Sequence, residues 1–159
     1  MYLRTATDDD LEFLYDMLVA AFNWDGTQRF TRTEIVEDPR TAHYVDGWRR
    51  GEAFGVVAID GDEPVGALWA QALPADTPGY GYVADDVPEI GIAVAAGHRG
   101  LGVGARLLAG GIDAARERGW RALSLSVEDG NDTARALYER HGFVVVGRNG
   151  DSDTMMREF

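Results

Sequence analysis

The chain has 159 residues, of which 45% are hydrophobic and 26% charged, a balance typical of one globular domain, so we expect residues 1–159 to form a single domain. It has no cysteine, which excludes disulfides, thiolate metal sites and cysteine nucleophiles. It also has no lysine, which excludes a Walker A phosphate loop and Schiff-base chemistry. The formal net charge of −12 disfavours nucleic acid and anionic membranes as partners. We see neither a basic, apolar leader nor an apolar run long enough to cross a bilayer, and we expect a cytoplasmic location.

The first part of the chain predicts a strand followed by a helix. Residues 2–7 form a short strand, and Thr7 with Asp10 matches a capping box that opens a helix. Apolar side chains then recur at helical spacing, at Leu11, Leu14, Tyr15, Leu18 and Phe22. Residues 22–31 form a loop that carries two aromatic residues.

Two short helices and a hairpin are expected next. Thr31 with Glu34 indicates one helix start, and Pro39 after Asp38 predicts a helix that runs to Gly47. Residues 51–60 and 63–73 are strands on either side of a Gly-Asp dipeptide at 61–62, a hairpin signature. Residues 74–88 form a long loop, and long loops in compact domains are often functional.

The second half alternates strands and helices. Residues 89–94 and 121–127 are predicted strands, and a helix from Val103 that ends at Gly119 lies between them. A last helix runs from Asn131 to His141 and is closed by Gly142, and residues 143–148 and 153–159 form a final pair of strands. This order predicts an α/β or α+β fold with a mixed sheet.

Three alternating glycines, Gly100, Gly102 and Gly104, stand where the predicted helix from Val103 begins. A helix N-terminus has free N–H groups and partial positive charge, and glycines let an anion approach these groups closely. Arg99 adds a charge that can be directed at the same anion. A tight turn without a ligand is the alternative. Three alternating glycines exceed what a turn requires, which favours a phosphate or pyrophosphate cradle.

The same glycines also match a dinucleotide-binding fingerprint. Gly100 to Ala105 read G-x-G-x-x-A, and Glu128 and Asp129 follow at roughly the distance of the ribose-binding acid. In that fold, however, the first glycine ends its strand directly, and the fingerprint lies in the first βαβ unit. Here residues 95–99 intervene and about ninety residues come first, so a nucleotide-dependent oxidoreductase is the less favoured interpretation.

Three motifs in order carry a resemblance to a known family. Arg99-Gly100-Leu101-Gly102-Val103-Gly104 matches the pattern Q/R-x-x-G-x-G/A, and Ile92-Ala93-Val94 matches the strand end before it. Asn131, Ala134, Leu137, Tyr138, Gly142 and Phe143 match the downstream pattern. Over residues 89–148 the chain thus resembles the GNAT superfamily of acyl-CoA-dependent N-acyltransferases. The resemblance implies a central mixed, mostly antiparallel sheet flanked by helices, acetyl-CoA as co-substrate, and transfer of the acetyl group to a primary amine.

The resemblance also assigns the cofactor-binding groups. Residues 99–104 and the following helix N-terminus would hold the pyrophosphate, and the backbone of Ile92, Ala93 and Val94 would pair with the pantetheine arm. An N–H near Val94 would face the thioester carbonyl. Asn131 and Tyr138 lie about two helical turns apart on one helix face, where Asn131 would bind the amides of the cofactor and Tyr138 would protonate the leaving thiolate. Taken alone, Asn131 could simply cap its helix and Tyr138 could simply pack.

Glu89 is the candidate general base, because some members of the family place theirs at this strand start. Other members use a glutamate five positions before the asparagine, where this chain has Ser126, which cannot serve. A surface ion after Pro88 is an equally good explanation of Glu89. A water chain that ends on a more distant carboxylate is a further alternative.

The acceptor pocket is expected from the loops at 22–31 and 74–88. Trp24, Phe30, Tyr80 and Tyr82 could form an aromatic wall, with Asp25, Asp85 or Asp86 attracting a cation, although loop aromatics also serve as anchors to a core. His43, His98 and His141 lack metal-ligand spacing, so no metal is expected.

The acceptor could be a small amine, an amino acid, an antibiotic or a peptide. A non-catalytic acyl-CoA-binding or sensing module is the alternative function, against which the presence of Tyr138 argues. The free edges of such a sheet would allow a homodimer.

Overall fold

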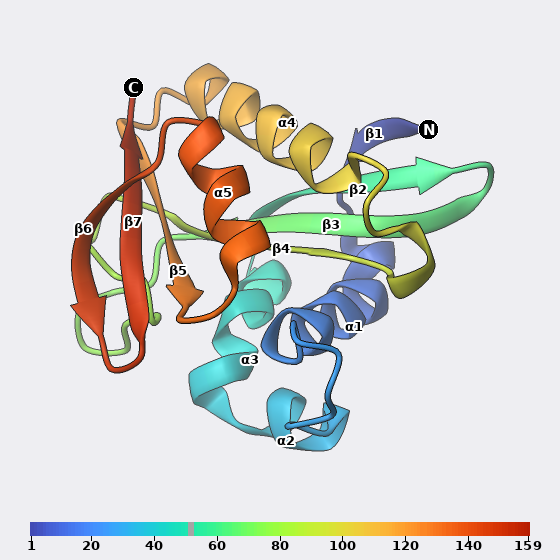
Figure 1. The fold of residues 1–159 in the computed structure, drawn as a ribbon, viewed down its shortest axis with the longest axis horizontal. Coiled ribbons are helices and arrows are strands. Elements are labelled where there is room, and N and C mark those ends of the chain that lie inside the picture. Colours follow the sequence, from blue (N-terminus) through green and yellow to red (C-terminus); the bar gives the residue numbers. More distant parts are fainter. Residues whose placement is uncertain (51–52) are drawn as a thin grey trace.

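The computed structural model describes residues 1–50 and 53–159, with a seven-stranded sheet and helices on both of its faces (Figure 1). The strands are β1 (Tyr2–Thr5), β2 (Phe54–Asp60), β3 (Glu63–Gln71), β4 (Glu89–Val94), β5 (Ala122–Glu128), β6 (Val144–Asn149) and β7 (Ser152–Glu158). The helices are α1 (Leu11–Phe22), α2 (Arg32–Glu37), α3 (Pro39–Asp46), α4 (Val103–Glu117) and α5 (Asp132–Arg140), with 3₁₀ turns at Asp8–Asp10, Gly47–Arg50 and Ala96–His98.

The sheet has the strand order β1-β2-β3-β4-β5-β7-β6. All neighbouring strands are antiparallel except β4 and β5, which are parallel. The predicted mixed, mostly antiparallel sheet with flanking helices is therefore confirmed. The parallel pair lies at the centre of the sheet, where α4 provides the crossover from β4 to β5.

Each face of the sheet has its own apolar core. Figure 1 shows α4 and α5 on one face and α1, α2 and α3 on the other. Successive side chains of a strand point to opposite faces. On β3, Leu68 accordingly packs with Leu107 of α4, while its neighbour Trp69 packs with Leu14 of α1. This two-sided burial explains the nearly continuous apolar sequence of β3.

The local signals in the sequence locate most element ends. The Thr7 N–H donates to the Asp10 carboxylate at 2.8 Å, so the chain turns there and β1 ends earlier than the predicted strand over 2–7. Thr31 caps α2 by accepting from the Glu34 N–H at 3.1 Å. The predicted strand over 51–60 is described only from residue 53 onward, and β2 begins at Phe54. Gly51 and Glu52 lie outside the described residues.

The described part of the chain contains no helix with the length and apolar character needed to cross a membrane.

Candidate active site

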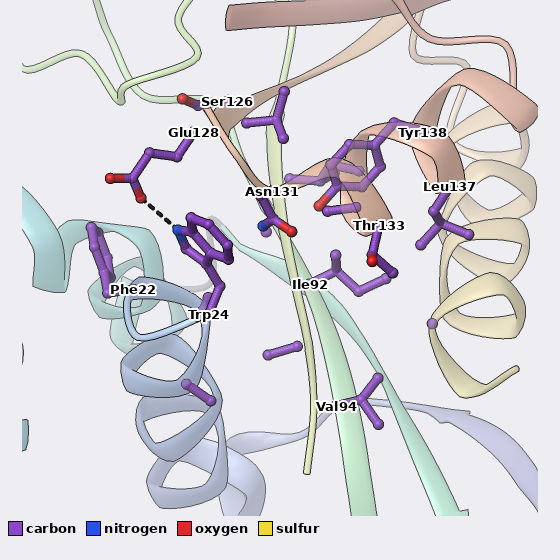
Figure 2. A pocket seen from close by; sticks show the side chains of 18 of the residues that line it. Phe22, Trp24, Ile92, Val94, Ser126, Glu128, Asn131, Thr133, Leu137 and Tyr138 are labelled. Carbon is purple, nitrogen blue, oxygen red and sulfur yellow. Dashed lines mark hydrogen bonds between the residues drawn. The ribbon is translucent and has the colours of Figure 1, made fainter. Parts of the chain in front are cut away.

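A large cavity lies where β4 and β5 separate. Over these two fully described strands, Glu89 and Ser124 form the single register pair. Further along β4, the edge that faces β5 therefore has no strand partner. The cavity beside it has a volume of about 1270 Å³ and is lined from α1, β4, the start of α4, α5 and the turn between β6 and β7. Figure 2 shows part of this lining, with α1 on one side of β4 and α5 on the other.

The glycine loop forms one end of this cavity. Gly100 and Gly102 have φ values of 77° and 82°, the left-handed region that side chains rarely adopt. A Cβ atom at either position would meet no atom within 4 Å, so the space beside the backbone is open. Both glycines line the cavity together with Arg99, Val103 and Gly104, whereas Leu101 is 69% exposed and lies outside the lining.

The start of α4 presents unpaired backbone donors to this open space. Gly102 is the residue before the helix, and the first backbone bond of the helix runs from the Arg106 N–H to the Gly102 carbonyl. The N–H groups of residues 103–105 precede it and have no helical acceptor. The Arg99 guanidinium is tethered nearby by donating to the Val94 carbonyl at 3.2 Å. The loop has the geometry of an anion cradle.

The strand β4 runs along the cavity from the glycine loop toward its other end. Ile92, Ala93 and Val94 all contribute to the lining. Because β5 diverges from β4 along this stretch, the backbone groups on that edge, apart from the Val94 carbonyl that Arg99 engages, are available to an extended ligand. An extended chain can add to such an edge as an extra strand.

The helix α5 contributes the predicted asparagine and tyrosine. Asn131 immediately precedes α5, and its side chain makes no capping bond, so the role of helix cap does not explain it. Tyr138 is 8% exposed and packs against Phe143 with ring centroids 6.2 Å apart. Both residues line the cavity, and Figure 2 shows the Tyr138 hydroxyl directed toward Asn131. Burial raises the pKa of Tyr138 to about 12, so the phenol keeps its proton at neutral pH.

Glu89 lies at the start of β4 and is not a surface ion, since it is only 5% exposed. Its Oε2 accepts from the Tyr44 hydroxyl at 2.8 Å, and its Oε1 has no hydrogen-bond partner among the described residues. Burial raises its pKa from 4.5 to about 7, while the hydrogen bond from Tyr44 opposes that rise. A carboxyl group with such a pKa can take up and release a proton near neutral pH.

Glu128, at the end of β5, is a cavity residue that sequence analysis did not assign to this site. It accepts from the Trp24 indole N–H at 2.6 Å and from two nitrogens of Arg29 at 2.9 and 2.8 Å. The Arg29 guanidinium keeps the pKa of Glu128 below its usual range. These bonds fasten the 22–31 loop to the sheet across the cavity, as the Trp24 bond in Figure 2 shows.

The expected aromatic wall is only partly assembled. Trp24, Phe30 and Tyr80 line the cavity, and Phe22 joins them with ring centroids 5.9 Å from Phe30 and 6.1 Å from Tyr80. Tyr82 instead lines a separate groove beside β6.

Of the three expected acidic residues, only Asp25 lies at the cavity. Asp85 accepts from the Tyr82 hydroxyl at 2.8 Å, and Asp86 is paired with Arg121 at 2.6 Å, both outside the lining. Ser126 does line the cavity. Among residues 1–50 and 53–159, no group of three His, Cys, Asp or Glu side chains is placed to hold a metal ion.

Several known proteins with a similar sequence or fold are acetyltransferases. The mycothiol acetyltransferase of Paenarthrobacter aurescens (strain TC1) is 30% identical over 118 residues, which cover 72% of this chain. The chain spans about a third of that relative, since the match covers 33% of its length.

Solved structures share the fold over its full length. The ribosomal-protein-alanine N-acetyltransferase of Brucella melitensis has a TM-score of 0.72 at 24% identity, with 100% of both chains covered. The PaiA N-acetyltransferase of Thermoplasma acidophilum, solved with coenzyme A, has a TM-score of 0.73 at 14% identity, again over 100% of both chains. YncA, a putative acetyltransferase of Salmonella typhimurium solved with acetyl-CoA, has a TM-score of 0.74 at 21% identity and covers 99% of this chain and 93% of its own.

The family profile described as "Acetyltransferase (GNAT) family" matches residues 11–143. That range includes the glycine loop, the free edge of β4, and Asn131 and Tyr138 on α5. The chain therefore belongs to the GNAT family of acetyltransferases.

Proposed function

We propose that the chain is a single N-acetyltransferase domain that moves the acetyl group of acetyl-CoA to a primary amine. The observation that carries this proposal is the composition of one cavity. It combines an anion cradle at α4, an unpaired strand edge on β4, a protonated tyrosine on one side, and a buried glutamate with a pKa of about 7 on the other. Each supports one requirement of acyl transfer from a thioester.

The cofactor-binding residues in this proposal follow the cavity from end to end. Residues 99–104 and the first turn of α4 hold the pyrophosphate through backbone N–H groups, with Arg99 adding charge. The edge of β4 at residues 92–94 binds the pantetheine arm, and Asn131 bonds its amide groups. A backbone N–H near Val94 donates to the thioester oxygen, where negative charge develops in the transition state.

The proton transfers are assigned to the two buried titratable groups. The Glu89 carboxylate accepts a proton from the acceptor ammonium, directly or through water, and frees the nitrogen lone pair. The amine attacks the thioester carbon, the carbon–sulfur bond breaks, and Tyr138 gives its hydroxyl proton to the leaving thiolate. The nitrogen loses its remaining excess proton to solvent, solvent returns a proton to Tyr138, and Glu89 releases its proton to solvent before the next turnover.

The acceptor binds at the end of the cavity between the two loops. The wall of Trp24, Phe30 and Tyr80, with Asp25 beside it, supports a substrate that combines an apolar body with a cationic amine. Small amines, amino acids, antibiotics and peptide N-termini are the classes to compare. The charge of −12 supports an enzyme that binds neither nucleic acid nor anionic membranes, and we keep a cytoplasmic location as part of the proposal.

The experiment that tests this function is a coupled assay of thiol release from acetyl-CoA across a panel of those four amine classes. We expect release above the rate without amine for at least one class, and acetylated product by mass spectrometry. Stable binding of acetyl-CoA without turnover on any amine would instead favour the non-catalytic acyl-CoA module.

A further inference from the structure

Tyr44 joins three parts of the chain that are distant in sequence. It lies on α3 and is 5% exposed. Its hydroxyl donates to Glu89 Oε2 on β4 at 2.8 Å and accepts from the Tyr80 N–H of the 74–88 loop at 2.7 Å. Both hydrogen-bonding roles of the hydroxyl are therefore used, and the carboxylate and the loop are bound to the same atom.

The 74–88 loop lies against the Glu89 carboxylate at Gly79. A Cβ atom on Gly79 would lie 2.1 Å from Glu89 Oε1 and 2.8 Å from the Tyr44 hydroxyl. A Cβ atom on Gly81 would lie 2.6 Å from the backbone carbon of Leu125 on β5. Close approach explains both glycines, because any side chain would hold the loop away from the carboxylate or from the sheet.

We propose that Tyr44 is a positioning residue for Glu89, whose carboxylate it holds against the Gly79–Gly81 segment at the acceptor end of the cavity. The inference rests on the proposed role of Glu89 as base, and it adds a residue that acts on the reaction through Glu89. Tyr44 acts through the hydrogen bond that it donates, so its effect must be visible in the protonation of Glu89.

The surroundings of Glu89 make that hydrogen bond the main polar influence on the carboxylate. The side chains in register with it, Gln71 on β3 and Ser124 on β5, are uncharged. On α3, the His43 ring packs edge-on against Tyr44, and burial lowers its pKa, which keeps it neutral. Tyr44 itself stays protonated, because burial raises its pKa well above the ordinary value. Loss of the Tyr44 hydroxyl should therefore raise the pKa of Glu89 further.

The test uses Tyr44→Phe, which removes the hydroxyl and keeps the ring. The matched control is Tyr15→Phe, because Tyr15 lies in the same core cluster and also donates its hydroxyl to a carboxylate, that of Asp46. The first measurement is a pH titration of 13C-labelled glutamate side chains by NMR, with Glu89→Gln to identify the Glu89 signal. We expect the midpoint of Glu89 to rise by about one pH unit in Tyr44→Phe and to stay in place in Tyr15→Phe.

Gly79→Ala gives a second variant, in which the added methyl group clashes with Glu89 Oε1 and with the Tyr44 hydroxyl and so disturbs the hydrogen bond between them. The Glu89 midpoint should rise there as well. An unchanged midpoint in both Tyr44→Phe and Gly79→Ala would overturn the positioning role, and so would an equal shift in the Tyr15→Phe control.

The second measurement is the pH dependence of kcat/KM with the best amine of the panel. The acidic limb should move upward with the NMR midpoint in Tyr44→Phe and stay in place in Tyr15→Phe. If kcat/KM falls in Tyr44→Phe but the acidic limb of the profile stays in place, Tyr44 only packs in the core and the proposal is overturned. The titration needs no turnover, so it decides the Tyr44–Glu89 link even if no amine is acetylated, a result that would contradict the proposed function alone.

Discussion

At the scale of single residues, burial gives two side chains opposite proton-transfer roles. It raises the pKa of Glu89 to about 7 and that of Tyr138 to about 12. Glu89 can then lose and regain a proton near neutral pH, whereas Tyr138 remains a donor throughout the physiological range. Glu89 belongs to β4 and bonds to Tyr44 of α3, whereas Tyr138 lies on α5, which covers the other face of the sheet (Figure 1), so the proposed proton acceptor and proton donor remain separate.

Tyr138→Phe tests the donor. Phenylalanine keeps the packing against Phe143 and removes the proton, so we expect kcat to fall by roughly 10²–10⁴-fold while the KM for acetyl-CoA changes little. Steady-state kinetics with an amine for which acyl transfer limits the rate provides the measurement. A loss of stability with kcat nearly intact would show that Tyr138 only packs.

Glu89→Gln tests the buried carboxyl through stability. A carboxyl whose pKa is raised on folding contributes stability below its unfolded pKa of about 4.5, and this contribution is lost as pH rises through about 7. The advantage of the wild type over Glu89→Gln in free energy of unfolding should thus shrink by on the order of 3 kcal/mol between pH 4 and pH 8. Urea unfolding at several pH values measures it. A difference that does not vary with pH would mean that Glu89 titrates normally.

At the scale of elements, the start of α4 has a left-handed backbone at Gly102 and an open anion site beside it. Substitutions can separate the effect of the first on stability from the effect of the second on binding. Gly102 before α4 and Gly119 after it have φ values of 82° and 75°, and both face open space. Only Gly102 lines the cavity. Both ends of α4 therefore have a glycine with a left-handed backbone, but only the glycine at the start of the helix lies beside the proposed cofactor site.

Gly102→Val and Gly119→Val form the matched pair. Both should lower the free energy of unfolding by a similar amount, on the order of 1–3 kcal/mol, because valine disfavours a left-handed backbone. Only Gly102→Val should lose binding of acetyl-CoA, which calorimetry of the folded variants measures. Equal affinity in both would mean that the cradle is wrongly assigned.

The positions of most helices and strands could be predicted from the sequence, whereas the contacts between distant elements could not. Caps, hairpin turns and the glycine loop are local signals, and so the positions of most helices and strands could be predicted. The contacts of Tyr44 with Glu89 and of Trp24 with Glu128 join segments far apart in the chain, and no local pattern encodes them. The same reason explains why Tyr82 was expected at the acceptor pocket: its aromatic character is visible in the sequence, but the direction in which its loop presents it is not.

At the scale of the whole molecule, acetyl-CoA should stabilise the native state, because it binds the folded chain and not the unfolded one. At a concentration about 100 times its Kd the gain is about 2.7 kcal/mol, which corresponds to an increase in Tm of roughly 5–10 °C for a chain of this size. Thermal unfolding with acetyl-CoA, and with NAD as the control, provides the measurement. A shift with NAD alone would favour the nucleotide-dependent oxidoreductase instead.

The separation of β4 from β5 leaves a stretch of strand edge unpaired in the middle of the sheet, where a continuous ladder would protect it. In the free protein, the amide hydrogens on that edge of β4 should exchange with deuterated solvent much faster than those that face β3. If the pantetheine arm takes the place of the missing strand, acetyl-CoA will slow exchange at those amides of residues 92–94 that face away from β3 and leave β1 and β2 unaffected. Mass spectrometry of deuterium uptake would then map the path of the co-substrate directly onto the backbone.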